Sequence, residues 1–263
     1  MWSELEKNRK KYLNLNLHNT LDYEKFCMMS IIYHSTKIEG CSLTETDTMV
    51  LLDKDITAKG KPLKDHLMIK DHYNAFLFLK SQAKQKRNLS IEFIRETCAI
   101  LMKNTGEIIH STGGSFDTSK GELRLAPVYV DKKYFPDYKK VPGLLKTLVE
   151  NVNQKLDTLD DENEILKLSS DVHYNLVNIH PFGDGNGRLS RLFMNYILMF
   201  HEQPYVKIFT EDRAEYIDAL NETEEKEDVS IFRDFICKQQ NKFFKIEIEK
   251  HAKSGGNFNL LFS

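Results

Sequence analysis

The sequence lacks several features that would assign it to a common class of proteins. It has no charge excess, because its net charge is −2 and its isoelectric point about 6.5. This balance argues against a nucleic-acid partner, and the absence of a polybasic tract argues against a membrane surface. No apolar run reaches the roughly 18 residues of a membrane span, and the polar first residues lack the apolar centre of a signal peptide. The four cysteines form no C-x-x-C pair, so we expect reduced thiols in a cytoplasmic protein.

What the sequence does contain is helical periodicity over most of its length. A chain of 263 residues can form one large domain or two small ones. Residues 1–19 are expected to be a loose or partly helical lead-in. Helices are predicted over about 22–34, 44–52, 90–103, 141–156 and 161–179, and after Pro62, Gly187, Arg213 and Val229. Glycines punctuate residues 104–136, where the β-rich stretch 122–130 predicts a hairpin. The predicted fold class is therefore mostly α with a small β-hairpin.

The most informative stretch runs from His180 to Arg191 and reads HPFGDGNGRLSR. The apolar residues that follow recur at helical spacing: Leu189, Leu192, Phe193, Tyr196, Ile197 and Phe200. The loop therefore leads into a helix N-terminus, where free N–H groups and the helix dipole favour an anion. Arg188 and Arg191 share one face of the first turn. Their planar guanidinium groups suit phosphate oxygens.

Other residues of this loop add chemistry to the predicted phosphate site. Mg²⁺ is usually held by one carboxylate together with substrate phosphates, so Asp184 is the expected metal ligand. His180, with an ordinary pKa of about 6.5, can accept a proton near neutral pH. Gly183, Gly185 and Gly187 let the backbone approach a ligand closely. The spacing does not fit a Rossmann loop, a P-loop or an EF-hand. The plain alternative is a helix–loop–helix corner with solvated charges.

These twelve residues resemble the Fic signature, His-x-Phe-x-Asp/Glu-Gly-Asn-Gly-Arg-x-x-Arg, at every fixed position. Upstream, Ser35-Thr-Lys-Ile-Glu39-Gly40 resembles the Ser/Thr-x-x-x-Glu-Gly/Asn motif of Fic proteins that have an N-terminal inhibitory helix. The resemblance covers about residues 20–245 and implies the helical Fic (fido) fold with a β-hairpin flap. It divides the chain into three regions. Residues 1–88 would form an N-terminal helical region with the inhibitory helix at about 22–40. Residues 89–228 would form the catalytic core with the flap at about 113–131, and residues 229–263 a C-terminal helix and tail.

The resemblance implies a protein adenylyltransferase, which moves AMP from ATP to a Ser, Thr or Tyr hydroxyl of a protein and releases pyrophosphate. In this interpretation His180 deprotonates the hydroxyl, Asp184 holds Mg²⁺, and Phe182 anchors the loop to the core. The remaining loop residues bind the nucleotide phosphates: Gly183, Gly185, Asn186, Gly187, Arg188 and Arg191.

The resemblance also assigns roles outside the loop. Glu39, with Ser35 in the same motif, would pair with Arg191 and hold ATP in a non-productive pose. Tyr216 ends an Arg-x-x-Tyr motif that often lies near the nucleotide base in Fic proteins. His173 is expected to be a structural or surface residue.

The flap is expected to bind the target. Gly121-x-x-Arg124 resembles the Gly-x-x-Arg of the Fic flap, so Gly121, Leu123 and Arg124 would hold an extended target segment by edge-strand pairing. An ordinary surface hairpin is the alternative. The target could be the chain itself, and the helical surface is compatible with a homodimer. Three other activities stay open: removal of AMP from a modified protein with Glu39 orienting a water, transfer of another phosphate-containing group, and silent nucleotide binding.

Overall fold

The computed structural model describes residues 1–17, 22–130 and 133–253. The first half of the chain forms α1 (Trp2–Asn14), α2 (Tyr23–Ile38), α3 (Glu45–Lys54), α4 (Leu63–Lys84) and α5 (Ile91–Leu101). The second half forms α6 (Val141–Leu156), α7 (Glu162–Ile179), α8 (Asn186–Phe200), α9 (Arg213–Glu225) and α10 (Val229–Lys253). Short 3₁₀ turns are η2 (Thr118–Lys120), η3 (Tyr138–Lys140) and η4 (Thr210–Asp212). The mostly helical fold predicted from the periodicity is confirmed.

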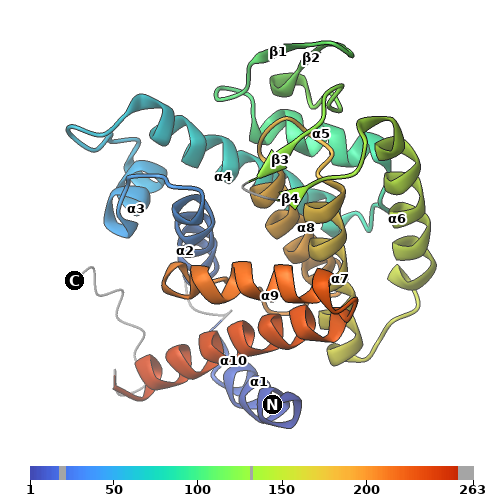
Figure 1. The fold of residues 1–263 in the computed structure, drawn as a ribbon. Helices are drawn as coiled ribbons and strands as arrows, with labels where there is room; N and C mark the ends of the chain where they lie inside the picture. Colours follow the sequence, from blue (N-terminus) through green and yellow to red (C-terminus); the bar gives the residue numbers. More distant parts are fainter. Residues whose placement is uncertain (18–21, 131–132, 254–263) are drawn as a thin grey trace.

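The loose or partly helical lead-in expected over residues 1–19 contains a regular helix as far as Asn14. Figure 1 shows α1 beside α10, although they lie at opposite ends of the chain. The two helices are joined by a stack of Tyr12 on Phe244, with ring centroids 4.7 Å apart, and by a hydrogen bond between Asn8 and Asn241. Of the two expected forms, the structure has the partly helical one. Long-range packing, which a local apolar pattern does not reveal, stabilises α1.

The β structure lies partly outside the predicted place. β1 (Ile108–Ser111) pairs with β2 (Gly114–Asp117), and β3 (Tyr129–Val130) pairs with β4 (Lys133–Tyr134), both antiparallel. Residues 121–128 form no strand, so the strand expected over 122–130 is wrong except at its last two residues. Residue 131, at the end of the predicted flap, lies outside the described residues. The segment fails to form a strand because Arg124 bonds it to the loop that follows α7, as described below.

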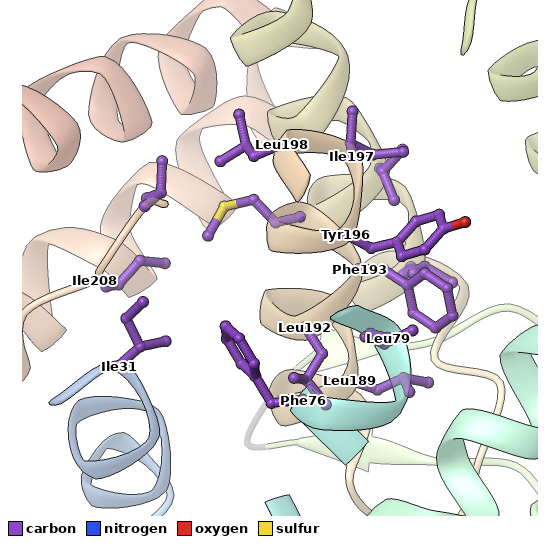
Figure 2. Packing of buried hydrophobic residues seen from close by; sticks show 14 of the residues in the cluster. Ile31, Phe76, Leu79, Leu189, Leu192, Phe193, Tyr196, Ile197, Leu198 and Ile208 are labelled. Atoms are coloured by element: carbon purple, nitrogen blue, oxygen red, sulfur yellow. The ribbon is translucent and has the colours of Figure 1, made fainter. Parts of the chain in front are cut away.

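The helix that follows the glycine loop, α8, is the central element of the core. Every residue of the predicted apolar stripe is buried, and so are the polar residues of the opposite face, including Asn195. Figure 2 shows apolar side chains of α8 around a core shared with Phe76 and Leu79 of α4, Ile31 of α2 and Ile208. Asn195 bonds the backbone of Val206 through both its oxygen and its nitrogen. The start of α8 is therefore held by packing on all sides.

One hydrophobic cluster extends from Leu5 in α1 to Phe244 in α10. Residues from all three predicted regions of the chain contribute to this cluster. Among the described helices, none combines the length and the apolar composition that crossing a bilayer requires.

Candidate active site

His180 follows the last residue of α7 and has a left-handed backbone conformation, with φ 49° and ψ 59°. Its Nδ1 lies 3.2 Å from the carbonyl oxygen of Val177. A carbonyl oxygen only accepts, so Nδ1 carries the proton and Nε2 keeps a free lone pair. Burial lowers the pKa of His180 to about 4, which keeps the imidazole neutral at pH 7. A neutral imidazole with a free Nε2 has the protonation state of a general base.

The ring of His180 is held in place by the β3–β4 hairpin. Phe135 stacks on the imidazole, with ring centroids 3.9 Å apart and 28° between the planes. The amide of Phe135 donates to Val128 O and closes the hairpin. Lys133 bonds Asn178 of α7 and Glu224 of α9, each at 2.6 Å. The sequence analysis missed Phe135, because nothing in the local pattern relates it to a histidine 45 positions later.

Arg124 holds the same loop by hydrogen bonds from the protein interior. Its guanidinium group is buried, with the residue 1% exposed, and donates to the carbonyls of His180, Ala126 and Pro136. Its backbone N–H donates to Pro181 O at 3.0 Å. The Arg124 side chain therefore bonds carbonyls within its own protein, and the expected role of this segment in holding a target by main-chain pairing stays a prediction. Leu123 packs partly buried against the core.

The glycine-rich loop is closed by Asn186. Its side-chain oxygen accepts from Phe182 N at 3.0 Å and its nitrogen donates to Phe182 O at 2.9 Å. Phe182 is fully buried, as expected for an anchor. Both polar atoms of the Asn186 side chain therefore help to close the loop. Its amide nitrogen has a second N–H, and the expectation that Asn186 binds phosphate stays a prediction. Gly183 lies against Ile109 of β1.

The turn into α8 requires a glycine at position 185. Gly185 has φ +82°, and a Cβ there would lie 2.7 Å from the sulfur of Met102. The same sulfur lies 3.2 Å from Nη2 of Arg188, whose side chain is only 2% exposed. Nη1 of Arg188 is buried and has no hydrogen-bond partner among the described residues. The loop therefore covers a cation that has an unused donor, an arrangement that suits an anion.

Asp184 is the exposed acid of this loop. Its side chain is 62% exposed, and one oxygen accepts from the amide of Gly185 at 2.6 Å while the other lies 3.9 Å from Arg188. The described residues contain no group of three or more His, Cys, Asp or Glu side chains that could hold a metal ion. A single solvated carboxylate fits Mg²⁺ that takes its other ligands from phosphates and water, and does not fit an all-protein metal site.

Arg191 brings the predicted inhibitory motif to the tip of α8. Its Nη2 lies 2.5 Å from Glu39 Oε1, and Nε donates to Ser35 Oγ at 2.9 Å. Nη2 also donates to the carbonyl oxygen of Ser35 at 2.9 Å. The pairing of Glu39 with Arg191, predicted across 152 positions, is therefore present in the structure.

Gly187 explains how closely the carboxylate approaches. A Cβ on Gly187 would lie 2.5 Å from Glu39 Oε1. The carboxylate of Glu39 therefore rests against the first turn of α8, where the dipole and the free N–H groups favour an anion. Burial raises the pKa of Glu39, but Arg191 and Arg188 outweigh it, and the net pKa lies below its usual value. Glu39 is thus an anion bound at the N-terminus of α8 beside Arg191.

The end of α2 that carries Glu39 is fixed by contacts that the sequence analysis missed. Arg213, at the start of α9, donates through Nε to Ile38 O at 3.0 Å. His34 Nδ1 accepts from the amide of Thr210 at 3.1 Å and lies 2.9 Å from its hydroxyl. These bonds join the last turn of α2 to η4 and α9, so the position of Glu39 depends on three separate segments.

Tyr216 lies beneath Arg191 and is only 2% exposed. Its hydroxyl is 3.4 Å from Arg191 Nη1 and 3.1 Å from Nε2 of His173, which is fully buried. The structure therefore places Tyr216 behind the site. His173 is an interior residue.

A family model agrees with this geometry. Residues 88–198 match the model described as the Fic/DOC family. The chain is 32% identical over 216 residues to a protein adenylyltransferase Fic of Aedes aegypti, covering 81% of this chain and 40% of that protein. It is 29% identical over 198 residues to protein adenylyltransferase fic-1 of Caenorhabditis briggsae, covering 72% of this chain and 35% of that protein. The chain thus spans less than half the length of these curated relatives.

Solved structures share the fold over nearly the whole chain. A Fic-domain-containing signaling protein from Bacteroides thetaiotaomicron superposes with a TM-score of 0.80 at 25% identity, covering 95% of this chain and 97% of that one. Fic-1 from Caenorhabditis elegans superposes with a TM-score of 0.76 at 25% identity, covering 97% of this chain and 72% of that one. With the signature loop at the tip of α8 and relatives of this kind, the chain belongs to the Fic/DOC family through its residues 88–198.

Proposed function

We propose that this protein transfers AMP from ATP to a hydroxyl group of a protein, and that Glu39 holds this activity off. The observation that carries the proposal is the juxtaposition of a neutral imidazole that has a free Nε2 with a helix N-terminus lined by Arg188 and Arg191. The relatives in insects and nematodes that carry the name protein adenylyltransferase support the same reaction.

In this reaction, His180 Nε2 takes the proton of the target hydroxyl as its oxygen attacks the α-phosphorus. The bond from that phosphorus to the bridging oxygen breaks, and pyrophosphate leaves. The guanidinium groups of Arg188 and Arg191 bind the β- and γ-phosphates, and the amide of Gly187 in the first turn of α8 would donate to the charge that develops. Positioning and electrostatics account for most of the catalysis in phosphoryl-type transfer. Asp184 would hold Mg²⁺, which would supply positive charge to neutralise the phosphates.

Glu39 inhibits by occupying the place of a phosphate. Its carboxylate lies on Arg191 and against Gly187, where the outer phosphates of ATP would otherwise bind. ATP can then bind in a productive pose only if the end of α2 moves or Glu39 is replaced. Ser35 contributes by bonding the same guanidinium group.

The target segment is expected beside the β3–β4 hairpin. Tyr129 and Tyr134 form a cross-strand pair there and are 67% and 79% exposed. Phe135 links this hairpin to His180. In this proposal Gly121, Leu123 and Arg124 support the hairpin, and its free edge receives the target main chain.

The test uses ATP labelled at the α- or the γ-phosphate, with Mg²⁺ and a lysate or the protein itself as target. We expect weak or no labelling by the wild type, strong α-label transfer by Glu39→Gly, and none by Glu39→Gly combined with His180→Ala. Glu24→Gly is the matched control, because Glu24 lies on the same helix but bonds Lys80 and Tyr205 instead of Arg191. It should label no more than the wild type.

The other outcomes separate the alternatives. Transfer of the γ-label without the α-label would show that another phosphate group is moved. Binding of ATP by Glu39→Gly without any labelling would favour a silent nucleotide-binding module. Release of AMP from a modified target only when Glu39 is intact would favour the reverse reaction.

A further inference from the structure

We propose that Tyr216 and His173 are positioning residues that hold the guanidinium group of Arg191, and that Tyr216 does not contact the nucleotide base. This inference rests on the proposed function, because it concerns how Arg191 meets the outer phosphates of ATP. The three residues come from α8, α9 and α7. They form a continuous contact from Arg191 Nη1 through the Tyr216 hydroxyl, at 3.4 Å, to His173 Nε2, at 3.1 Å.

The chemistry of the three groups sets the direction of these bonds. A guanidinium group only donates, so the Tyr216 oxygen accepts from Arg191. The hydroxyl hydrogen is then free to be donated to His173 Nε2, which requires that this nitrogen carry no proton. Burial, and then the charge of Arg191, lower the pKa of His173 well below its usual value. His173 is therefore neutral. Nε2 accepts this bond when the proton is on Nδ1, which is buried and has no hydrogen-bond partner among the described residues.

Aromatic packing fixes the two rings from behind. His173 stacks on Phe232 of α10, with ring centroids 4.9 Å apart and 27° between the planes. Tyr216 packs against Phe235 of the same helix, with centroids 5.8 Å apart. With the Tyr216 ring 2% exposed, no face of it is free to stack on a base. Its hydroxyl contacts Arg191 and His173.

The consequence concerns the active state. Glu39 and Ser35 hold Arg191 from α2, and these contacts change when the end of α2 moves. Tyr216 belongs to α9 and His173 to α7, so their contacts with Arg191 do not require α2. They would keep one edge of the guanidinium group in place while Nη2 exchanges the carboxylate of Glu39 for a phosphate.

The experiment measures the affinity of the Glu39→Gly protein for Mg²⁺–ATP and for AMP by calorimetry. AMP lacks the phosphates that Arg191 would bind, so it reports on the base and α-phosphate contacts alone. We expect Glu39→Gly with Tyr216→Phe to bind ATP about 5- to 10-fold more weakly, corresponding to one lost hydrogen bond to a charged group. Its affinity for AMP should stay within about twofold. Tyr12→Phe is the matched control. It removes the hydroxyl of a tyrosine in α1 that is hydrogen-bonded to Tyr23 and not to Arg191, and it should change neither affinity.

A second pair of variants tests the acceptor. His173→Leu removes the acceptor of the Tyr216 hydroxyl and should weaken the binding of ATP but not of AMP. His173→Gln keeps an oxygen near the position of Nε2 and should retain most of the affinity for ATP. An equal loss of ATP and AMP affinity in Tyr216→Phe would overturn the inference in favour of a base contact. Unchanged ATP affinity in Tyr216→Phe would overturn it alone and leave the proposed function standing. A Glu39→Gly protein that binds no ATP would overturn both.

Discussion

Replacing Glu39 by glutamine should destabilise the protein and at the same time strengthen its binding of ATP. The change removes one charge and keeps the shape of the side chain. Arg191 would lose its carboxylate partner while remaining buried. Breaking a fully buried ion pair costs about 3–5 kcal/mol, and an exposed pair contributes less than about 1 kcal/mol. The Arg191 side chain is 4% exposed and that of Glu39 is 36% exposed. An intermediate loss of roughly 2 kcal/mol follows, which in a chain of this size lowers the unfolding temperature by roughly 4–8 °C.

The same free energy should appear in the binding of ATP. In the wild type, ATP must displace Glu39 from Arg191, whereas in Glu39→Gln it meets a cation without a charged partner. A difference of roughly 2 kcal/mol corresponds to about 30-fold in Kd. At ATP concentrations about a hundredfold above Kd, the ligand adds about 2.7 kcal/mol of stability. Saturating ATP should therefore more than restore the unfolding temperature of the variant.

Differential scanning fluorimetry with and without Mg²⁺–ATP, together with calorimetric Kd values, measures both effects. Glu24→Gln, on the same helix, should change neither the Kd nor the ATP-dependent shift. The reasoning is refuted if Glu39→Gln unfolds at the wild-type temperature and ATP shifts both proteins equally. Such a result would mean that Glu39 does not occupy the place of a phosphate.

Three further predictions concern the supports of the site. Arg124→Met should lower the free energy of unfolding by roughly 3 kcal/mol, because it leaves buried carbonyls without a donor, and it should abolish labelling by Glu39→Gly. Urea unfolding measures the loss of stability. The control Arg95→Met, which removes the bond from Arg95 Nε to Gly121 O, should lower the free energy of unfolding clearly less. Gly121→Ala should lower the free energy of unfolding by roughly 2 kcal/mol or more, because φ is +61° and the new Cβ would lie 2.0 Å from Arg95 O. In the control Gly143→Ala the new Cβ meets nothing within 4 Å, so that variant should be neutral or slightly stabilising. Equal unfolding curves of the two variants would contradict this prediction. The labelling rate of Glu39→Gly should stay constant from pH 8 to 6 and fall to half only near pH 4, because burial lowers the pKa of His180 to about 4 and the imidazole is protonated only below that value. A rate–pH profile measures this. A rate that falls to half near pH 6.5 would show that the pKa of the base is not lowered.

The residues of the site could be predicted from the sequence because the loop is local. Three glycines, one carboxylate, one imidazole and two arginines lie within twelve residues of an apolar helical pattern. Backbone geometry then dictates that the arginines share a face of the first turn. The helices from α2 to α10 also followed from periodicity, and their bounds lie close to those predicted.

The sequence was misleading where a residue's role depends on distant partners. The β propensity of residues 122–130 predicted a strand, yet Arg124 bonds the carbonyls of Ala126 within that segment, Pro136 after it and His180. Nor did the sequence indicate that the Asn186 side chain closes the loop through the backbone of Phe182. Tyr216 and Phe135 carry no local signal of their positions beside Arg191 and His180.

By itself, then, the sequence determined the helical architecture and the chemistry of the loop, since helix periodicity and the conformational freedom of glycine act over a few residues. The pairing of Glu39 with Arg191 could be named only by resemblance to a family. Tertiary structure decided where that carboxylate lies, how far it is exposed, and which buried groups hold Arg191. Those properties arise from the packing of α2, α7, α8 and α9 around one another. The contacts of Arg191 with Tyr216 and with Glu39 join residues 25 and 152 positions apart, and contacts over such separations leave no periodic trace in the sequence.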